Sequence, residues 1–478
     1  MARADEKGNS VDWLDESRFA DIHTFVYSGM RFEPETGVAE FDFAHEGNDQ
    51  RLHFIENVEF PLPDSGVSAA GLATFHRVLE LLYIAVGTFY YKVMAPPQVS
   101  ITAVPLAPAA ADWAWQLYRD GLAEYAHRHA LEYVLDLPVH TRYRVPAGVV
   151  HDLGASGRAP LVGFSGGKDS IVALEVLKSG GFAPATFTTD RRIKPQLELL
   201  MRKAQARLLR VRPRSDPQLK ELMRHTALLR GHTPLTAMTS LVGTAVAALH
   251  GLGPAVLANE RSADEPNLVW RGRDVNHQWA KSAAAEQALD RALREHAGIA
   301  SGCFSLLRGM GELEISRWFA ALEGYDELFS SCNVVVRSTD PHRTQRWCRD
   351  CAKCRWVFLA LASVMPRSRL VRIFERDLLD DRAQVEGYRA LLGLDGHKPL
   401  DCVGEIVEAR VALRQLAEDP QWRDTAVLCE LASQIPPVAP DQTERAWRVD
   451  RVGSVPAAYQ AALDRWSPST AGSAHGGS

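Results

Sequence analysis

The segment Ser165 to Ser170, with the sequence Ser-Gly-Gly-Lys-Asp-Ser, has the residue types of an anion-binding loop. Its glycines let backbone N–H groups close around an anion, and Lys168 adds a full positive charge that we expect to face solvent. A helix that begins here would add the partial positive charge of its N-terminus. The segment therefore predicts a site for phosphate or pyrophosphate. It is not a Walker A loop, which requires G-x-x-x-x-G-K-[ST].

A strand and a helix must flank such a loop, and the sequence supplies both. Leu161 to Phe164 is a short apolar run typical of a buried strand. After the loop, apolar residues recur at helical spacing from Ile171 to Leu177, and Gly180-Gly181 ends the pattern. An ordinary glycine-rich turn does not require this order, so we favour the phosphate site.

Three cysteines, Cys348, Cys351 and Cys354, follow one another at C-x2-C spacing, and Cys332 lies upstream. Four thiolates can close a tetrahedral zinc site, which would be structural because no coordination position stays open. Three thiolates at this spacing can also hold an iron–sulfur cluster, and buried thiols without a metal are the third alternative. We favour zinc. The remaining cysteines are isolated and are expected in the core: Cys303, Cys402 and Cys429.

Strand and helix patterns alternate from Leu161 onward, which indicates an α/β fold with a central parallel sheet and helices on both faces. We expect strands at 185–189 and 255–258, and helices at 197–209 and 235–249. Ligands of such sheets bind beyond the carboxyl ends of the strands. A solvated loop would also be polar, but two polar segments follow strand ends or open helices: 231–234 and 259–282.

Different patterns flank this central unit. Residues 1–150 combine strand alternation, as in Val38 to Phe43 and Arg51 to Phe60, with helical patterning, which predicts an α+β domain. The remaining predicted units are an α/β domain with the cysteine cluster at 151–365, a helical domain at 366–465 and a disordered Ser/Gly-rich tail at 466–478.

The composition is that of a soluble globular protein. The 478 residues are 46% hydrophobic and 24% charged, with a net charge of −5, so no global charge points to nucleic acid. No apolar run approaches the roughly 20 residues of a membrane span. Met1 to Ser10 is too polar for a signal peptide. We therefore expect a cytoplasmic protein without a membrane partner; the sequence carries no indication of an oligomeric state.

The glycine loop resembles the SGGxDS loop of PP-loop ATP pyrophosphatases, which cleave ATP between its α and β phosphates and adenylate a substrate. This resemblance implies a HUP-like central domain that uses ATP and Mg²⁺. Further segments resemble one bacterial family within the superfamily, the MurL type of UDP-N-acetylmuramoyl-L-alanyl-L-glutamate epimerases. The resemblance runs from about Phe25 to Leu416 and includes the cysteines and residues 87–97, 231–234, 258–263, 275–278, 281–282, 331–333 and 398–405.

The family's reaction inverts the terminal L-glutamate of UDP-MurNAc-L-Ala-L-Glu to D-glutamate, with release of AMP and pyrophosphate, in peptidoglycan precursor biosynthesis. The resemblance thus implies an ATP-dependent epimerase of this sugar-nucleotide dipeptide. Adenylation would remove the negative charge of the glutamate carboxylate and give an acyl group that delocalises an α-carbanion. Removal of a proton on one face and its return on the other would then invert the centre.

The resemblance also implies roles for individual residues. Ser165, Gly166, Gly167 and Ser170 would cradle pyrophosphate, Lys168 would neutralise it, and Asp169 would bind Mg²⁺ unless it caps the following helix. Thr189 or Asp190, at the next strand end, would border adenosine. Proton-transfer candidates are Glu260, His277, Lys281 and His232, the last of which is equally suited to a structural role. Substrate-binding candidates are Arg261, Asn276, His277 and Lys281.

An adenylating enzyme that modifies tRNA or a nucleobase is the alternative. Basic residues around the cysteines could meet tRNA phosphates or, equally, the diphosphate of a UDP-sugar. They are Arg337, Arg343, Arg346, Arg349, Lys353 and Arg355. The acidic net charge favours the small substrate over a nucleic acid. A non-catalytic nucleotide-binding regulator is a third reading, which the intact loop argues against.

Overall fold

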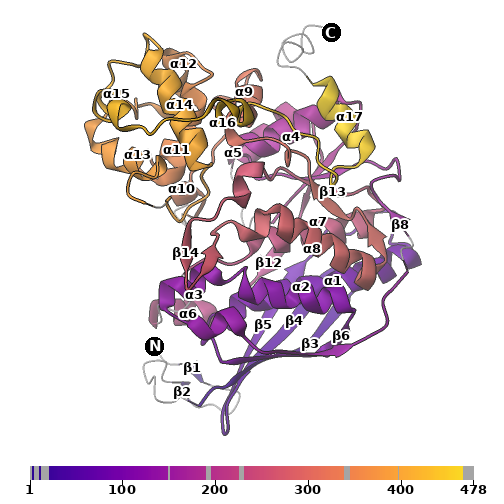
Figure 1. Cartoon of the computed structure of the whole chain (residues 1–478). Helices are drawn as coiled ribbons and strands as arrows, with labels where there is room; N and C mark the ends of the chain where they lie inside the picture. Colours follow the sequence, from indigo (N-terminus) through magenta and orange to yellow (C-terminus); the bar gives the residue numbers. More distant parts are fainter. Residues whose placement is uncertain are drawn as a thin grey trace.

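The computed structural model in Figure 1 describes residues 3–4, 10–11, 21–148, 151–189, 195–225, 231–337, 345–396 and 398–466. All structural statements here concern these residues. Apart from Trp466, the predicted disordered tail lies outside them, and so does Asp190.

Five strands from the N-terminal part of the chain and one later strand, β12, form a six-stranded mixed sheet with the order β12-β5-β4-β3-β6-β7. The strands β3, β4 and β5 are antiparallel neighbours, whereas β3 pairs with β6, and β6 with β7, in parallel. The strands predicted from Val38 and from Arg51 are confirmed as β4 and β5. The bounds are β3 (Thr24–Glu33), β4 (Val38–Glu46), β5 (Arg51–Glu59), β6 (Gln98–Leu106), β7 (Val139–Tyr143) and β12 (Arg212–Arg214).

A long helix, α1 (Ala69–Tyr91), packs on β3 and β4 and also on α7 (Leu235–His250). Gly87 lies against the ring of Tyr27, where a Cβ atom would come within 2.4 Å of ring carbons. In the described part of the chain, α1 is the one helix whose length and composition would allow it to cross a membrane. No apolar segment of that length was expected from the sequence. From Phe75 onward most of the apolar side chains of α1 are buried in the protein core, as those of a core helix are.

The central sheet is parallel, with the order β11-β10-β9-β13-β17. The chain moves outward from β9 to β11 and then returns to the other side of β9 with β13. The carboxyl ends of β9 and β13 are therefore neighbours at the switch point where doubly wound sheets bind ligands. The bounds are β9 (Leu161–Gly163), β10 (Ala185–Thr188), β11 (Leu208–Arg210), β13 (Ala255–Leu257) and β17 (Cys303–Ser305).

Successive strand residues of this sheet enter different cores. Leu161 joins an apolar core with α1 and α7, whereas Val162 joins a second core with α4 (Lys168–Ser179) and α11 (Ala352–Ala362). Side chains alternate between the two faces of a strand, so both faces of the sheet are covered by helices. The predicted α/β class, with a parallel sheet between helices, is confirmed.

The helix predicted at 197–209 is wrong in its second half. Helix α5 (Pro195–Ala204) ends where Gln205 takes a φ of 49°, and Leu208 begins β11. Leu208 pairs with Thr186 of β10. Tertiary pairing supplies the backbone hydrogen bonds that a longer helix would have made, and a window of local sequence does not contain that partner.

The described residues beyond α11 form helices, as predicted for this region, and most of them gather in the orange bundle at the upper left of Figure 1. The last helix leaves this bundle and packs on α4, where Tyr459 stacks on Phe182 with ring centroids 4.7 Å apart. The domain limits at 150 and 365 remain predictions: one apolar core contains residues on both sides of position 150, and the other contains residues on both sides of position 365. These helices are α12 (Arg367–Phe374), α13 (Val385–Leu391), α14 (Ile406–Glu418), α15 (Ala426–Leu431), α16 (Pro440–Ala446) and α17 (Ala457–Arg465).

Shorter elements complete the connections between these units. The remaining helices are α2 (Pro108–Arg119), α3 (Ala123–His129), α6 (Gln218–His225), α8 (Ala283–Ala292), α9 (Glu312–Ala320) and α10 (Asn333–Arg337). The remaining strands are β1 (Arg3–Ala4), β2 (Ser10–Val11), β8 (His151–Asp152), β14 (Leu268–Trp270), β15 (Arg273–Val275) and β16 (Ile299–Ala300).

Candidate active site

The glycine loop lies at the carboxyl end of β9, and α4 begins at its lysine, as predicted. Gly166 has a φ of 81°, in the left-handed region that favours glycine. Gly167 occupies the N-cap position and brings no capping side chain, and a Cβ atom there would lie 3.0 Å from Ser331 Oγ. The first-turn N–H groups of α4 have no capping side chain to bind, which suits an anionic ligand. Ser170 donates its hydroxyl to Gly167 O at 2.9 Å.

Lys168 is fully buried, which contradicts the expectation that it faces solvent. Its Nζ forms ion pairs with Asp169 and with Glu312, the first residue of α9. Burial opposes the positive charge, but Asp169 and then Glu312 outweigh burial and raise the pKa of Lys168. The error arose because Glu312 is 144 residues away in the chain, so no local pattern showed that α9 covers the loop.

Glu312 bridges two lysines and was not a candidate from the sequence. Its Oε1 accepts a hydrogen bond from Lys353 Nζ at 3.0 Å, while its backbone N–H donates to Ser262 Oγ at 3.2 Å. The residue is 1% exposed. Burial disfavours its carboxylate, but Lys168 and Lys353 prevail and hold the pKa of Glu312 well below its usual range. Glu312 is therefore a charged carboxylate buried behind the loop.

Glu260 and Lys281 extend this cluster from β13. Glu260 follows that strand, and its Oε1 lies 3.9 Å from Lys281 Nζ. Burial opposes the charge of Lys281, but nearby negative groups outweigh burial and raise its pKa. Glu260 has the largest of these effects, and Asp169 has a smaller one. Burial raises the pKa of Asp169, against the opposing effect of Lys168. Three carboxylates and three lysines thus influence one another beyond the strand ends: Asp169, Glu260, Glu312, Lys168, Lys281 and Lys353.

The two candidate histidines, His232 and His277, lie against each other with ring centroids 4.6 Å apart. The His232 segment is held by the N-terminal part of the chain, because Lys92 Nζ donates to Gly231 O at 2.7 Å and the Glu124 carboxylate accepts the His232 N–H. Burial lowers the pKa of Lys92 to about 8. The two polar segments predicted at strand ends therefore meet in space.

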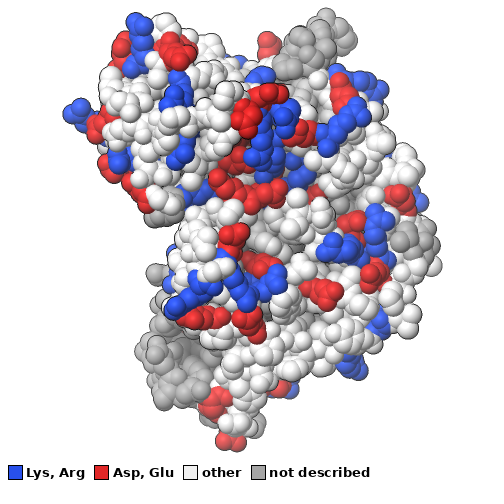
Figure 2. Space-filling view, in the orientation of Figure 1, with Lys and Arg blue, Asp and Glu red and all other residues white. Residues whose placement is uncertain are grey.

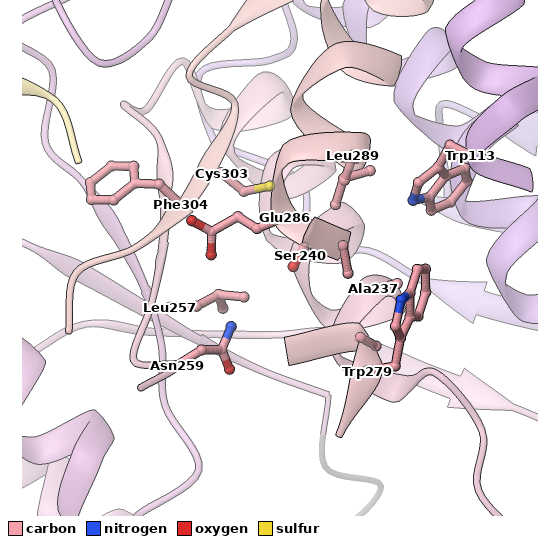
Figure 3. A pocket seen from close by; sticks show the side chains of 12 residues that line it. Trp113, Ala237, Ser240, Leu257, Asn259, Trp279, Glu286, Leu289, Cys303 and Phe304 are labelled. Atoms are coloured by element: carbon pink, nitrogen blue, oxygen red, sulfur yellow. The ribbon is translucent and has the colours of Figure 1, made fainter. Parts of the chain in front are cut away.

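Arg261 lies in the wall of a groove of about 1130 Å³. Its guanidinium donates to Asp450 Oδ2 at 2.9 Å and to Arg445 O at 2.6 Å, so the C-terminal part of the chain holds it in place. A second cavity, shown in Figure 3, has a volume of only about 10 Å³ and lies between Trp113, Glu286 and Cys303. That volume holds about one water molecule. The groove, by contrast, has the size of a site for a large organic ligand.

The remaining predicted residues occupy separate positions. Asn276 Nδ2 donates to Ala263 O at 2.8 Å, which ties its own loop together. Thr189 is half-buried directly after β10, at the carboxyl edge of the sheet, whereas Asp190 lies outside the described residues.

Glu408 is a further buried acid that the sequence did not single out. Its Oε2 accepts hydrogen bonds from Ser262 Oγ at 2.6 Å and from Glu405 N at 3.0 Å, which joins α14 to the site. Burial, followed by the neighbouring Glu405, raises the pKa of Glu408 to about 7. The spacing of Glu405 and Glu408 at the start of α14 is that of a capping box, a local signal that could have found the pair.

The raised pKa of Glu408 predicts a pH-dependent stability. Between pH 4.5 and about 7 the folded protein retains a proton on Glu408 that the unfolded chain releases. The contribution is complete below pH 4.5 and is lost as pH rises to about 7, by up to about 3 kcal/mol at ~1.4 kcal/mol per pH unit. Relative to the parent protein, Glu408→Gln should therefore gain unfolding free energy across this window in urea titrations. A difference that stays constant with pH would contradict the raised pKa.

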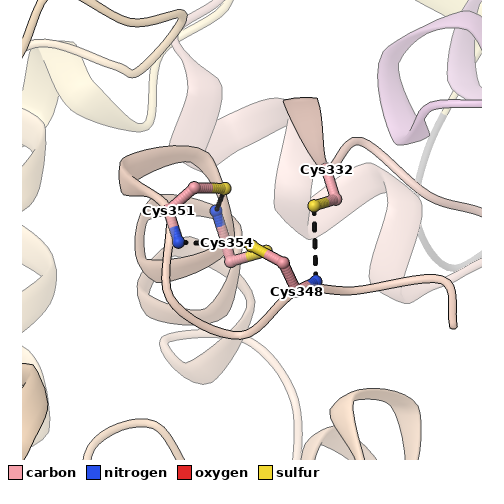
Figure 4. Close-up of side chains that lie close together, drawn as sticks. All are labelled: Cys332, Cys348, Cys351 and Cys354. Atoms are coloured by element: carbon pink, nitrogen blue, oxygen red, sulfur yellow. Dashed lines mark hydrogen bonds between the residues drawn. The ribbon is translucent and has the colours of Figure 1, made fainter. Parts of the chain in front are cut away.

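The four clustered cysteines converge, as the sequence predicts for a metal site. Their Sγ atoms all lie within 4.8 Å of one another, and those of Cys348 and Cys354 are 3.7 Å apart (Figure 4). A tetrahedral zinc site with bonds of about 2.3 Å places sulfurs about 3.8 Å apart. Backbone N–H groups donate to three of the sulfurs; one is Cys348 N to Cys332 Sγ, at 3.3 Å. The four residues form no disulfide. This donor set fits zinc.

The cysteine cluster also supports the glycine loop. Ser330 N, two residues before Cys332, donates to Gly166 O at 3.1 Å. Lys353, between two of the cysteines in α11, reaches Glu312. An ordered cysteine cluster therefore fixes the Ser330 segment against the glycine loop and holds Lys353 at Glu312.

The basic residues around the cysteines do not form an open patch in the part of the chain that the structure describes. Arg346 donates to Asp326 O at 2.8 Å, Arg349 to Phe374 O and Arg355 to Gln384 Oε1, each at 2.7 Å. Lys353 is buried at Glu312, Arg343 lies outside the described residues, and the Arg337 side chain is not described. On the face in Figure 2, basic and acidic side chains are interspersed. These observations give no support to a surface for tRNA.

Comparison with known proteins gives consistent matches along the chain. The MurL N-terminal domain family matches residues 16–306, and the MurL C-terminal domain family matches residues 328–446. A Salinispora tropica protein is 45% identical over 438 residues, which cover 91% of this chain and 92% of that protein. A Micromonospora protein is 45% identical, covering 87% of this chain and 92% of its own. A Xanthomonas oryzae pv. oryzae protein is 34% identical, covering 87% and 90%.

Each of these three relatives is named UDP-N-acetyl-alpha-D-muramoyl-L-alanyl-L-glutamate epimerase. No solved structure matches the chain. The matches span both sheets and the helical C-terminal bundle, so they concern the complete site and not the glycine loop alone.

Proposed function

This chain belongs to the MurL family of UDP-N-acetyl-alpha-D-muramoyl-L-alanyl-L-glutamate epimerases, and we propose that it inverts the terminal glutamate of that sugar-nucleotide dipeptide by an ATP-dependent route. The epimerase activity follows from the family. One observation carries the ATP route: a glycine loop with a buried lysine lies at the switch point between β9 and β13, within a cluster of lysines and carboxylates.

The chemistry of inversion explains why such a site would use ATP. A proton on the α-carbon beside an ionised carboxylate is hard to remove, because the carbanion would lie next to a negative charge. Attack of the carboxylate oxygen on the α-phosphorus forms an acyl-adenylate and releases pyrophosphate. The acyl carbonyl then accepts the electron pair of the broken C–H bond, and water later releases AMP and the inverted glutamate.

We assign the nucleotide to the carboxyl edge of the central sheet, in a PP-loop ATP pyrophosphatase fold of the HUP type. Ser165, Gly166, Gly167 and Ser170 would surround pyrophosphate, with Lys168 as its cation. Asp169 would hold Mg²⁺, a hard cation that prefers oxygen ligands and would supply positive charge to the phosphates. Thr189 would border the adenosine, since it follows the adjacent strand β10.

The polar residues around β13 would act on the dipeptide end of the substrate. We propose that Glu260, Lys281, His277 and His232 move protons or bind a carboxylate; their positions beside the charged cluster or beside each other support this assignment. Arg261 and Asn276 are proposed as substrate contacts; Arg261 would first have to leave Asp450. The groove beside Arg261 offers space for a bulky substrate.

A structural zinc ion is proposed for Cys332, Cys348, Cys351 and Cys354. The sulfur separations and the N–H···S hydrogen bonds support zinc, and four sulfur ligands leave no position for substrate. Bound zinc would supply no chemical step. A cytoplasmic location likewise remains a proposal.

The decisive experiment is incubation with ATP, Mg²⁺ and UDP-MurNAc-L-Ala-L-Glu in deuterated water. We expect the terminal glutamate to become D-glutamate with one deuterium at its α-carbon, and AMP to appear with it, because the returned proton comes from solvent-exchanged groups. Chiral analysis, mass spectrometry and nucleotide chromatography measure the three products. Formation of ADP and phosphate would refute the adenylation route, and AMP formation with tRNA but not with the dipeptide would favour the RNA-modifying alternative.

A further inference from the structure

Cys402 was expected in the apolar core, but the structure places it in a polar loop beside the charged cluster. It is half-buried, in the loop 398–404 that precedes α14. Its backbone N–H donates to Asp401 Oδ1 at 2.8 Å, and the amide of Asn333 donates to the same oxygen. The Asp401 carboxylate therefore links the backbone of Cys402 to Asn333, which follows Cys332 of the cysteine cluster.

Two further hydrogen bonds tie the loop 398–404 to the segment that carries His277. Asn267 Nδ2 donates to Pro399 O at 2.7 Å, and Gln278 Nε2 donates to Val403 O at 3.2 Å. The His277 N–H in turn donates to Asn267 Oδ1 at 2.8 Å. Because the same residues brace both segments, the positions of Cys402 and His277 are fixed relative to each other.

The side chains of Cys402 and His277 face each other. Cys402 Sγ lies within 4.8 Å of a ring nitrogen of His277 and of a carboxylate oxygen of Asp401. His277 is 8% exposed, and its Nδ1 makes no hydrogen bond within the described part of the chain. A buried ring nitrogen without a partner is costly unless a ligand or a proton acceptor meets it. This second observation indicates that a bound group meets His277, the ring that lies beside Cys402.

The surroundings favour the thiolate form of Cys402. Burial opposes ionisation, but Lys281, then His277 and Lys353, outweigh burial and lower its pKa. The other isolated cysteines differ: burial raises the pKa of the Cys303 thiol within the core, and Cys429 is exposed. Thiolate, imidazole and carboxylate could also bind a metal ion, but the neighbouring ammonium of Lys281 opposes another cation.

We propose that Cys402, assisted by His277, is one of the two proton-transfer groups of the epimerisation. The proposal rests on the acyl-adenylate of the proposed function. The Cys402 thiolate takes the α-proton of the activated glutamate and becomes a thiol, while the C–H electron pair moves into the acyl carbonyl to give an enolate. A second acid protonates the opposite face, and Cys402 returns its proton to solvent through His277. No oxidant or reductant is needed.

Variants at Cys402 separate inversion from adenylation. Cys402→Ala and Cys402→Ser should still form AMP with substrate and ATP, but inversion should fall by about 100-fold or more, the usual contribution of a general base. Serine preserves the size of the side chain but remains protonated. Cys429→Ser, at the exposed cysteine, is the matched control and should invert glutamate at the parent rate.

A stereochemical readout tests the assignment to one face. With the L-Glu and D-Glu diastereomers in deuterated water, Cys402→Ala should exchange the α-proton of only one of them, because the second group still serves its own face. Inversion by Cys402→Ser within a few-fold of the parent rate would overturn the proposal. So would equal loss of AMP formation and inversion in both variants, since that pattern describes a structural residue.

The test also distinguishes failure of this inference from failure of the ATP route. If the parent protein inverts glutamate without forming AMP, the adenylation route is wrong, and the exchange pattern of the Cys402 variants still decides the proton-transfer role. If AMP forms as expected and both diastereomers exchange normally in Cys402→Ala, only the role of Cys402 is wrong.

Discussion

Replacing Lys168 by methionine is expected to lower substrate-dependent AMP formation by more than about 100-fold, the usual effect of removing a preorganised charge from a reacting group. Lys168 is buried at the start of α4, and its ammonium is paired with Asp169 and Glu312. Methionine keeps the length of the side chain but leaves the departing pyrophosphate without this cation. Quantitative nucleotide chromatography measures the effect.

Lys168→Met should also lower the free energy of unfolding, because Lys168 is buried. Replacing a lysine that faces solvent would change the free energy of unfolding little. Removal of one partner from a buried ion pair costs about 3–5 kcal/mol. Because Lys353 still pairs with Glu312, we expect the lower end of that range in urea unfolding. The double variant Lys168→Met/Asp169→Asn should recover part of the stability but none of the AMP formation, because Asp169 is the carboxylate that loses its lysine partner.

Lys178→Met provides the matched control in the same helix. Lys178 lies near the other end of α4, is partly exposed and pairs with Glu175 at 3.2 Å. Because Lys178 lies at the end of α4 opposite the glycine loop, this variant should retain AMP formation at the parent rate. AMP formation by Lys168→Met within tenfold of the parent rate would exclude the proposed role of Lys168.

Loss of the proposed zinc ion from the cysteine cluster is expected to have the second large effect. Cys351→Ser should reduce the zinc content of the purified protein from one equivalent toward zero. Structural zinc contributes about 10–16 kcal/mol of binding free energy in small peptides. At about 2.1 cal/mol/K of unfolding entropy per residue, loss of about 10 kcal/mol would lower the melting temperature of this 478-residue protein by roughly 10 °C. Elemental analysis and calorimetry measure these changes.

Activity should fall when the proposed zinc is lost, although four sulfur ligands would leave the ion no position for a reactant. Cys351 is the N-cap residue of α11, whose first turn carries Lys353 to Glu312, and the Cys332 segment contacts the glycine loop through Ser330. A chelator should therefore reduce AMP formation, and added zinc should restore it. Protein that contains no metal, together with an unchanged melting temperature in Cys351→Ser, would show that the cysteines are merely buried thiols.

Local patterns in the sequence were sufficient for the glycine loop. The order of apolar strand, Ser-Gly-Gly-Lys-Asp-Ser and amphipathic helix is contained in about 20 consecutive residues, and each part follows from the backbone preferences of its residues. The helix from Leu235 and the strands from Ala185 and Ala255 were predicted for the same reason. The tandem cysteines also predicted that the four thiols come together, because the spacing of ligands in the chain reflects their spacing around a metal.

Charge pairing across the site, in contrast, depends on contacts between distant segments. Glu312 had no recognisable pattern, yet it sets the environment of Lys168, and Lys353 was interpreted as part of a surface patch although it is buried. Burial changes the meaning of a charged residue, because an unpaired charge is costly in the interior and a partner must be present there. Only the packing of α9 against α4 and α11 identifies that partner.

Cys402 shows the same difference between a local sequence pattern and a tertiary contact for a single side chain. In the sequence it is an isolated cysteine, a residue type most often found in the core. The turn at Pro399 to Val403 and its hydrogen bonds to Asn267 and Gln278 bring the thiol to His277. The sequence by itself therefore determined the fold class and the glycine loop between strand and helix, which depend on short-range backbone preferences. The tertiary structure alone decided which acids, lysines and thiol face that loop, because electrostatic environment is set by neighbours in space and not by neighbours in the chain.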